Sequence, residues 1–248
     1  GEGEDKKRQV DPSLTSIGVD GCAGGWLLAA LKQGKLSLKK YGSVNDIVRD
    51  YPDFDGFLID MVIGLPGNKE QIRPDGFARK IIKERASTIF PAPCRQAIYA
   101  TSKAEAYRQN EIILGKKFTP LTLGIMPKMY QLDSFLQANP QYKNLIKESH
   151  PELCFARLNG KTVLSRKTEF EGIMDRIKIL SKYLPELDFS EISSYAVRLK
   201  CEIDDILDAI CLCVTANLAS QGYYEVIPEN PMYDDTGLLM QMIIPKLD

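Results

Sequence analysis

One short segment, residues 16–26, constrains this chain more than any other because it ends an apolar strand in a single carboxylate. Ile17 and Val19 are β-branched residues, which favour a strand, and the glycines that follow Asp20 permit the backbone angles of a tight turn. Residues 26–31 then continue as a second apolar strand. The pattern predicts a hairpin with Asp20 at its mouth, where the acid either holds a cation, contacts a phosphate or hydrogen-bonds its own turn.

A second apolar run, residues 56–66, also contains a single acid, Asp60. A near-continuous apolar run is typical of a strand that is covered on both faces. A buried carboxylate is costly unless it is paired or bound to a metal. We therefore expect Asp60 to emerge into a site at the end of its strand, with a purely structural role as the alternative.

A third group of acids lies at the start of a helix predicted over residues 199–218. Asp205 and Asp208 are three residues apart and therefore share one face of the helix, with Asp204 beside them. The turns that follow are apolar on almost every face, which predicts a deeply packed helix. Three like charges on one turn repel one another, and a divalent cation would offset this repulsion. The alternative is an acidic first turn that faces solvent.

The order of the predicted elements indicates the fold class. Three strands joined by tight turns open the chain, a short capped helix and the strand of Asp60 follow, and residues 144–148 form a further strand. This order predicts an α/β fold of the ribonuclease H type, a five-stranded mixed sheet flanked by helices with a helical insertion after the fourth strand. We expect three parts: a flexible N-terminal tail (1–14), the ribonuclease H-like domain (15–222, insertion at about 69–140) and a C-terminal extension packed on the domain or on a partner (223–248).

Within the insertion, helical patterns cover residues 73–85, 102–114 and 128–137. The insertion is expected to shape a substrate pocket. The only histidine, His150, follows the fifth strand and could act as a base or a ligand, although a lone histidine is more often a structural residue.

Composition limits the partners and the location of the protein. Lys and Arg total 32 and Asp and Glu total 33, so the chain is not a generally basic nucleic-acid coat, although a local positive patch is allowed. The six cysteines are scattered without a Cys-x-x-Cys pair, which is typical of reduced residues in an intracellular protein. The sequence shows neither a signal peptide nor a membrane-spanning run. We expect a cytoplasmic protein without membrane contact, and a homodimer is allowed.

The acids of the three segments form a candidate metal site. Four hard oxygen ligands without an accompanying set of cysteines or histidines favour magnesium or manganese over zinc. Two such ions about 4 Å apart would serve the hydrolysis of a phosphodiester. The predicted ligands are Asp20, Asp60, Asp205 and Asp208.

Several short motifs between residues 16 and 220 resemble the domain of unknown function 429 family, which is described as predicted nucleases of the ribonuclease H fold. The resemblance is carried by Gly18-Val19-Asp20-Gly21-Cys22, Ile59-Asp60, Ile63-Gly64-Leu65-Pro66, Ala78-Arg79, Phe90-Pro91-Ala92-Pro93, His150-Pro151-Glu152 and Asp204-Asp205-x-x-Asp208-Ala209. Two departures from the family pattern are Met61-Val62, where a proline-containing pair is expected, and Ala23, where an arginine is usual.

The resemblance implies an activity and roles for individual residues. The acid pattern is also similar to that of Holliday-junction resolvases, which implies that the four aspartates are catalytic metal ligands. Glu152 is a further candidate catalytic acid or a residue that orients the site. Four cations are candidate contacts to substrate phosphates: Arg79, Arg85, Lys167 and Arg176.

The sequence thus favours a metal-dependent nuclease that acts on a nucleic acid or nucleotide by a two-metal carboxylate mechanism. Two alternatives remain open. One is a protein that binds a nucleotide or nucleic acid without cleaving it. The other is an ATP-dependent phosphotransferase of the same superfamily, against which the chain is short and lacks a second glycine-rich phosphate loop.

Overall fold

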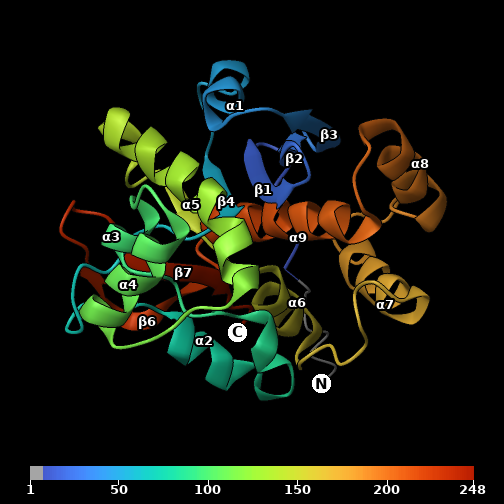
Figure 1. The fold of residues 1–248 in the computed structure, drawn as a ribbon. Helices are drawn as coiled ribbons and strands as arrows, with labels where there is room; N and C mark the ends of the chain where they lie inside the picture. The colour runs from blue at the N-terminus through green and yellow to red at the C-terminus, as the bar shows by residue number, and fades with distance from the viewer. Residues whose placement is uncertain (1–7) are drawn as a thin grey trace.

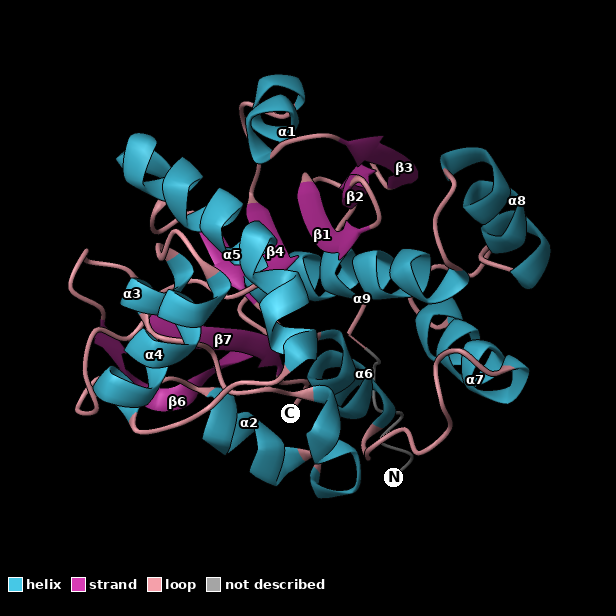
Figure 2. Ribbon diagram, viewed as in Figure 1, coloured by secondary structure: helices cyan, strands magenta, loops and turns pink. Residues whose placement is uncertain are grey.

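The computed structural model describes residues 8–248, and a five-stranded mixed sheet lies at its centre (Figures 1 and 2). The strands have the spatial order β3-β2-β1-β4-β5. The first three form antiparallel pairs, whereas β4 runs parallel to β1 and β5 runs parallel to β4. This arrangement confirms the predicted α/β class and is consistent with a ribonuclease H-like fold. The strands are β1 (Ser16–Cys22), β2 (Gly25–Lys32), β3 (Lys35–Tyr41), β4 (Gly56–Asp60) and β5 (Ile146–Glu148).

Helices cover both faces of the sheet, because the strands at its centre carry apolar side chains on both sides. On one face, Leu27 and Ala29 of β2 belong to a core that includes the helices of the C-terminal half. On the other face, Leu28 and Ala30 pack with helices of the N-terminal half and of the insertion. The first set is α6 (Pro151–Asn159), α7 (Phe170–Ser181), α8 (Phe189–Leu199) and α9 (Ile203–Ser220), and the second is α1 (Val44–Asp50), α3 (Arg95–Ile98), α4 (Lys103–Leu114) and α5 (Pro120–Ala138).

The segment between β4 and β5 is largely helical, and local sequence signals set the ends of its helices. Ser102 caps α4, because its hydroxyl accepts a hydrogen bond from the Glu105 amide at 3.1 Å. Helix α5 begins at Pro120, eight residues before the predicted start, because Thr119 caps it and proline suits a first helical turn. The helix predicted over 73–85 divides into α2 (Asp75–Ile81) and a 3-10 helix (Lys83–Thr88).

The first described residues and the C-terminal hairpin both pack against α9. The predicted tail, 1–14, lies partly outside the described residues, and in its described part the Asp11 amide donates to Asn217 Oδ1 at 2.8 Å. The C-terminal strands β6 (Tyr224–Tyr233) and β7 (Leu239–Pro245) form an antiparallel hairpin. This hairpin packs against β5, α6 and α9. Along the described residues, no helix combines the length and the apolar composition that a membrane span requires.

The close approach of α9 to the sheet fixes the position of the site. Figure 1 shows α9 running beneath the ends of β1 and β4. Glycines stand on both strands where the helix crosses. A Cβ on Gly18 would collide with the backbone of Ala209 and Cys213, and a Cβ on Gly56 would lie 2.9 Å from the Ala216 carbonyl oxygen. Only glycine allows the helix backbone to lie directly on the strands.

Substitution of Gly18 by alanine tests this packing. We expect Gly18→Ala to lower the free energy of unfolding by about 3 kcal/mol or more, because helix and strand must separate to admit the methyl group. Gly76→Ala is the matched control, since Gly76 lies in α2 and a methyl group added there would have no heavy atom within 4 Å. The control should be neutral or stabilising by up to about 1 kcal/mol. Urea unfolding measures both, and a Gly18→Ala protein as stable as the wild type would contradict the account.

Candidate metal centre

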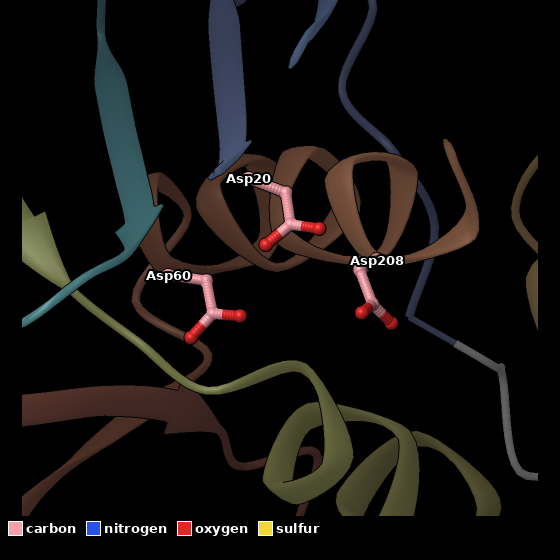
Figure 3. A group of neighbouring side chains, drawn as sticks. All are labelled: Asp20, Asp60 and Asp208. Atoms are coloured by element: carbon pink, nitrogen blue, oxygen red, sulfur yellow. The ribbon is translucent and has the colours of Figure 1, made fainter. Parts of the chain in front are cut away.

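Three carboxylates from three separate elements meet at one end of the sheet (Figure 3). Asp20 belongs to β1, Asp60 ends β4, and Asp208 lies in the second turn of α9. One oxygen of each carboxylate lies within 4.8 Å of an oxygen of the other two. This spacing allows one divalent cation to contact all three residues.

The pairing of the strands explains why two of these acids are neighbours. Strands β1 and β4 are parallel, and Asp20 pairs with Asp60 in their register. Adjacent parallel strands place their carboxyl ends at the same edge of the sheet, and residues paired in register point to the same face. Asp20 shares its face with Gly18, which α9 crosses, so the two acids lie on the face of the sheet that α9 covers.

The electrostatics of the cluster are unfavourable without a cation. Asp20 and Asp208 are only 5% and 2% exposed. Burial, followed by the charge of Asp60, raises the pKa of Asp20 well above its ordinary value. Burial also raises the pKa of Asp208 to about 7, and the neighbouring charges of Asp60 and Glu152 add to this effect. The cluster therefore favours protonation or the binding of a positive charge.

Lys167 supplies part of that positive charge. It lies in the loop between α6 and α7, and its Nζ donates to Asp208 Oδ2 at 3.0 Å. A longer ion pair of 3.7 Å joins it to Asp204. The attraction of Asp208 raises the pKa of the Lys167 ammonium, so the lysine stays charged at neutral pH. One lysine does not balance the three carboxylates of the cluster.

The second carboxylate oxygen of Asp208 has no hydrogen-bond donor among the described residues. This atom, Oδ1, is also buried. A buried carboxylate oxygen without a partner is strongly unfavourable. Because it belongs to the residue that meets Asp20 and Asp60, a cation bound by all three would satisfy it. The residues present therefore fit a divalent metal ion with oxygen ligands.

A cavity of about 560 Å³ gives access to the three acids. Its walls include the turn after β1, the start of α6 and part of α5. His150 lines it as well, with Nε2 3.2 Å from the Thr88 carbonyl oxygen and a buried Nδ1 that has no partner among the described residues. The cavity has room for a small substrate or for part of a larger one.

Comparison with known protein families places the chain. A family model described as "Protein of unknown function (DUF429)" matches residues 18–233, most of the chain and all three acids. The chain belongs to the DUF429 family. No curated protein and no solved structure gives a match to it.

The fourth predicted ligand, Asp205, is placed differently in this DUF429 protein. It lies one turn before Asp208 and accepts a hydrogen bond from the Glu202 amide at 3.3 Å, which caps the start of α9. Asp205 lines the same cavity but does not belong to the group of three. Burial and the neighbouring Asp204 raise the pKa of its carboxyl. The structure thus separates the two acids that helical spacing placed on one face.

Glu152 and Arg176 form a buried ion pair beside the cluster. The Arg176 guanidinium is fully buried and donates to Glu152 Oε2 at 3.0 Å and to the Ser165 carbonyl at 3.0 Å. These contacts leave the guanidinium no free face, so the geometry assigns Arg176 to the support of the site. Breaking one partner of such a pair leaves a buried charge and costs about 3–5 kcal/mol. Glu152 lines the cavity while its carboxylate is held in this pair.

The other predicted substrate contacts are spread over different surfaces. Lys167 is in the cavity beside Asp208. Arg85 donates to the Ser165 carbonyl at 3.2 Å, so it contacts the loop that carries Lys167. Arg79 is exposed and lines a neighbouring cavity of about 590 Å³. The structure therefore brings one of the four cations to the carboxylates.

Lys128 of α5 is a cavity residue that sequence analysis missed. Its side chain crosses Gly21, where a Cβ would lie 3.0 Å from Lys128 Cδ, and its Nζ lies 5.3 Å from the centre of the Trp26 ring. Trp26 follows β1 in the same hairpin as Asp20. No local signal marks Lys128, because α5 reaches the site only through tertiary packing. The lysine places a second cation in the cavity.

The raised pKa values predict how the metal-free protein responds to pH. A folded-state pKa above the unfolded value near 3.8 means that the folded chain retains protons that the unfolded chain releases. This contribution to stability is greatest below about pH 4 and is lost as the pH rises toward about 7. Asp20→Asn removes one of the repelling charges. In EDTA at about pH 8, we expect the variant to be more stable than the wild type by at least about 1 kcal/mol.

Urea unfolding at about pH 4 and about pH 8 checks this prediction, because the difference should nearly vanish at the lower pH. Asp53→Asn, an exposed residue before β4, is the control and should change stability little at either pH. A stability loss of equal size at both pH values in Asp20→Asn would contradict the electrostatic account.

Proposed function

We propose that this protein is a metal-dependent nuclease that hydrolyses phosphodiester bonds of a nucleic acid, with Asp20, Asp60 and Asp208 as ligands of magnesium or manganese. The observation that carries the proposal is the buried Asp208 Oδ1, which has no partner among the described residues and belongs to a group of three converging acids. A ligand set made of carboxylate oxygens favours these hard cations.

The chemistry fits this ligand set. A divalent cation supplies Lewis-acid stabilisation of phosphoryl oxygens and lowers the pKa of water. The protein contributes rigidity: two ligands lie on adjacent paired strands, and the third stands on a helix packed directly on those strands. Lys167 fixes the orientation of the Asp208 carboxylate through its 3.0 Å hydrogen bond. Such fixed positioning is the main contribution of a protein to metal-assisted hydrolysis.

Two cations in the cavity support a substrate that carries phosphates. Lys128 and Lys167 both line the cavity that holds the acids. Each is half-buried, so its charge is only partly screened by solvent, and Lys167 Nζ lies 3.0 Å from Asp208 Oδ2. In our proposal, Lys128 contacts a substrate phosphate next to the scissile one. It then takes the place of the arginine that the family pattern carries at position 23, where this chain has Ala23.

Cleavage assays test the proposal directly. Labelled single-stranded, hybrid and branched DNA and RNA are incubated with Mg²⁺, Mn²⁺ or EDTA. We expect metal-dependent cleavage of at least one of these substrates. Asp20→Asn and Asp208→Asn should each lower its rate by about a hundredfold or more, because even partners outside the ligand set commonly change activity by about 10–100-fold. Asp53→Asn, an exposed residue outside the lining of the cavity, should retain the wild-type rate.

Other outcomes would point elsewhere. Binding of oligonucleotides without cleavage under any metal condition would reject the nuclease and favour a non-catalytic binding protein. Saturable binding of ATP, coupled to phosphate transfer and lost in Asp20→Asn, would favour the phosphotransferase alternative. Cleavage that survives in both aspartate variants would show a contaminating enzyme and would contradict the proposal.

A further inference from the structure

A second cavity, of about 590 Å³, adjoins the cavity of the carboxylates. The two share Asp75 and Phe90 in their walls, although the second cavity is built mainly by the insertion between β4 and β5. Residues 66–80 form one side, and residues 110–122 form the other. A ligand that extends beyond the carboxylates in this direction enters the second cavity.

The second cavity is strongly basic, although the whole chain has a formal net charge of −1. Five exposed cations line it: Lys69, Arg79, Lys80, Lys116 and Lys117. None of the five forms an ion pair within residues 8–248. The one acid among its described lining residues is Asp75, which is buried and bound to Arg73. The five charges are thus available to an anionic ligand.

Aromatic rings accompany these charges. Phe77 is 45% exposed and lines the basic cavity, so its ring is accessible to a ligand there. Lys80 Nζ lies 5.9 Å from the centre of the Phe77 ring. Phe90 lines the wall that both cavities share. Exposed rings among cations are the combination that binds unpaired bases and their phosphates.

A buried ionic network makes the wall between the cavities rigid. Arg73 donates to Glu148 Oε2 at 2.7 Å and to Asp75 Oδ1 at 2.9 Å, and all three side chains are less than 10% exposed. A further bond of 2.9 Å joins Arg73 to the Ile63 carbonyl after β4. The network links the strand of Asp60 to the start of α2, so the carboxylates and the basic cavity keep a fixed relative position.

We infer that the basic cavity holds an unpaired stretch of nucleic-acid strand that continues from the carboxylates, an inference that rests on the proposed function. The five cations together neutralise the phosphates of this stretch, and Phe77 stacks on a base. A cavity of about 590 Å³ suits one or two splayed nucleotides, because most ligand cavities have volumes of about 300–1,000 Å³. A duplex keeps its bases stacked and offers Phe77 no free face. The substrate class is therefore a nucleic acid with a single-stranded segment next to the scissile bond.

Fluorescence anisotropy with a short labelled oligothymidylate tests the inference in EDTA, where no cleavage takes place. We expect Lys116→Ala/Lys117→Ala to weaken binding about tenfold and to reduce the slope of log affinity against log salt by about 0.7 for each phosphate left without its lysine. Phe77→Ala should weaken binding about fivefold or more, because the base then has no ring to stack on. The control is Lys32→Ala/Lys35→Ala, which removes the same charge from the exposed end of the β2–β3 hairpin. The control should bind within about twofold of the wild type.

The outcomes separate this inference from the nuclease proposal. Equal losses in the two double variants, no loss in either, or duplex binding as tight as single-strand binding would overturn the basic cavity as the strand path. Cleavage of the oligonucleotide with Mn²⁺ would then still support the nuclease. Conversely, selective loss in Lys116→Ala/Lys117→Ala and Phe77→Ala supports the strand path even if no metal condition gives cleavage.

Discussion

The direct contact between α9 and strand β1 is the constraint on which the rest of the structure depends. It exists because Gly18 has no side chain where the helix backbone crosses the strand. The helix is buried along most of its length, and its second turn carries Asp208 to the end of β1. A helix held away by even one methyl layer would withdraw Asp208 from Asp20 and Asp60. Fold stability and the candidate metal centre therefore rely on the same contact.

The cluster of Asp20, Asp60 and Asp208 destabilises the metal-free fold electrostatically. Burial and mutual repulsion raise the pKa of Asp20 and Asp208, and the Lys167 hydrogen bond relieves only part of the repulsion. Apolar side chains at these positions would stabilise the metal-free fold, so the cluster is better explained by a ligand than by stability. The surrounding arginine networks have a supporting role, because Arg176 and Arg73 each hold a buried glutamate in place. Positive charge that remains available to an anionic substrate lies on Lys128 and in the basic cavity.

The sequence predicted the fold and the position of Asp20 and Asp60 because both depend on local patterns. Two apolar strands that each end in one acid and pair in parallel must bring those acids together. Both Asp205 and Asp208 were predicted as ligands because helical spacing places them on one face, and the spacing does not show that Asp205 accepts the Glu202 amide while Asp208 joins the group of three. The sequence indicated Arg176 as a contact to substrate phosphate and gave no sign of its ion pair, since its partner Glu152 is 24 residues away. Lys128 and the basic cavity depend on how the insertion folds back on the sheet, which no local pattern encodes.

Calorimetric titration with manganese tests the central claim most directly. Wild type, Asp208→Asn and Asp205→Asn are compared at about pH 8, where the two variants make the same chemical change three residues apart on one helix. We expect saturable binding to the wild type and loss of that binding in Asp208→Asn. Asp205→Asn should lower the manganese affinity by no more than about tenfold, the smallest effect that is typical of a residue outside the ligand set. Absence of binding to the wild type, or equal effects of the two substitutions, would contradict a metal centre made by Asp20, Asp60 and Asp208.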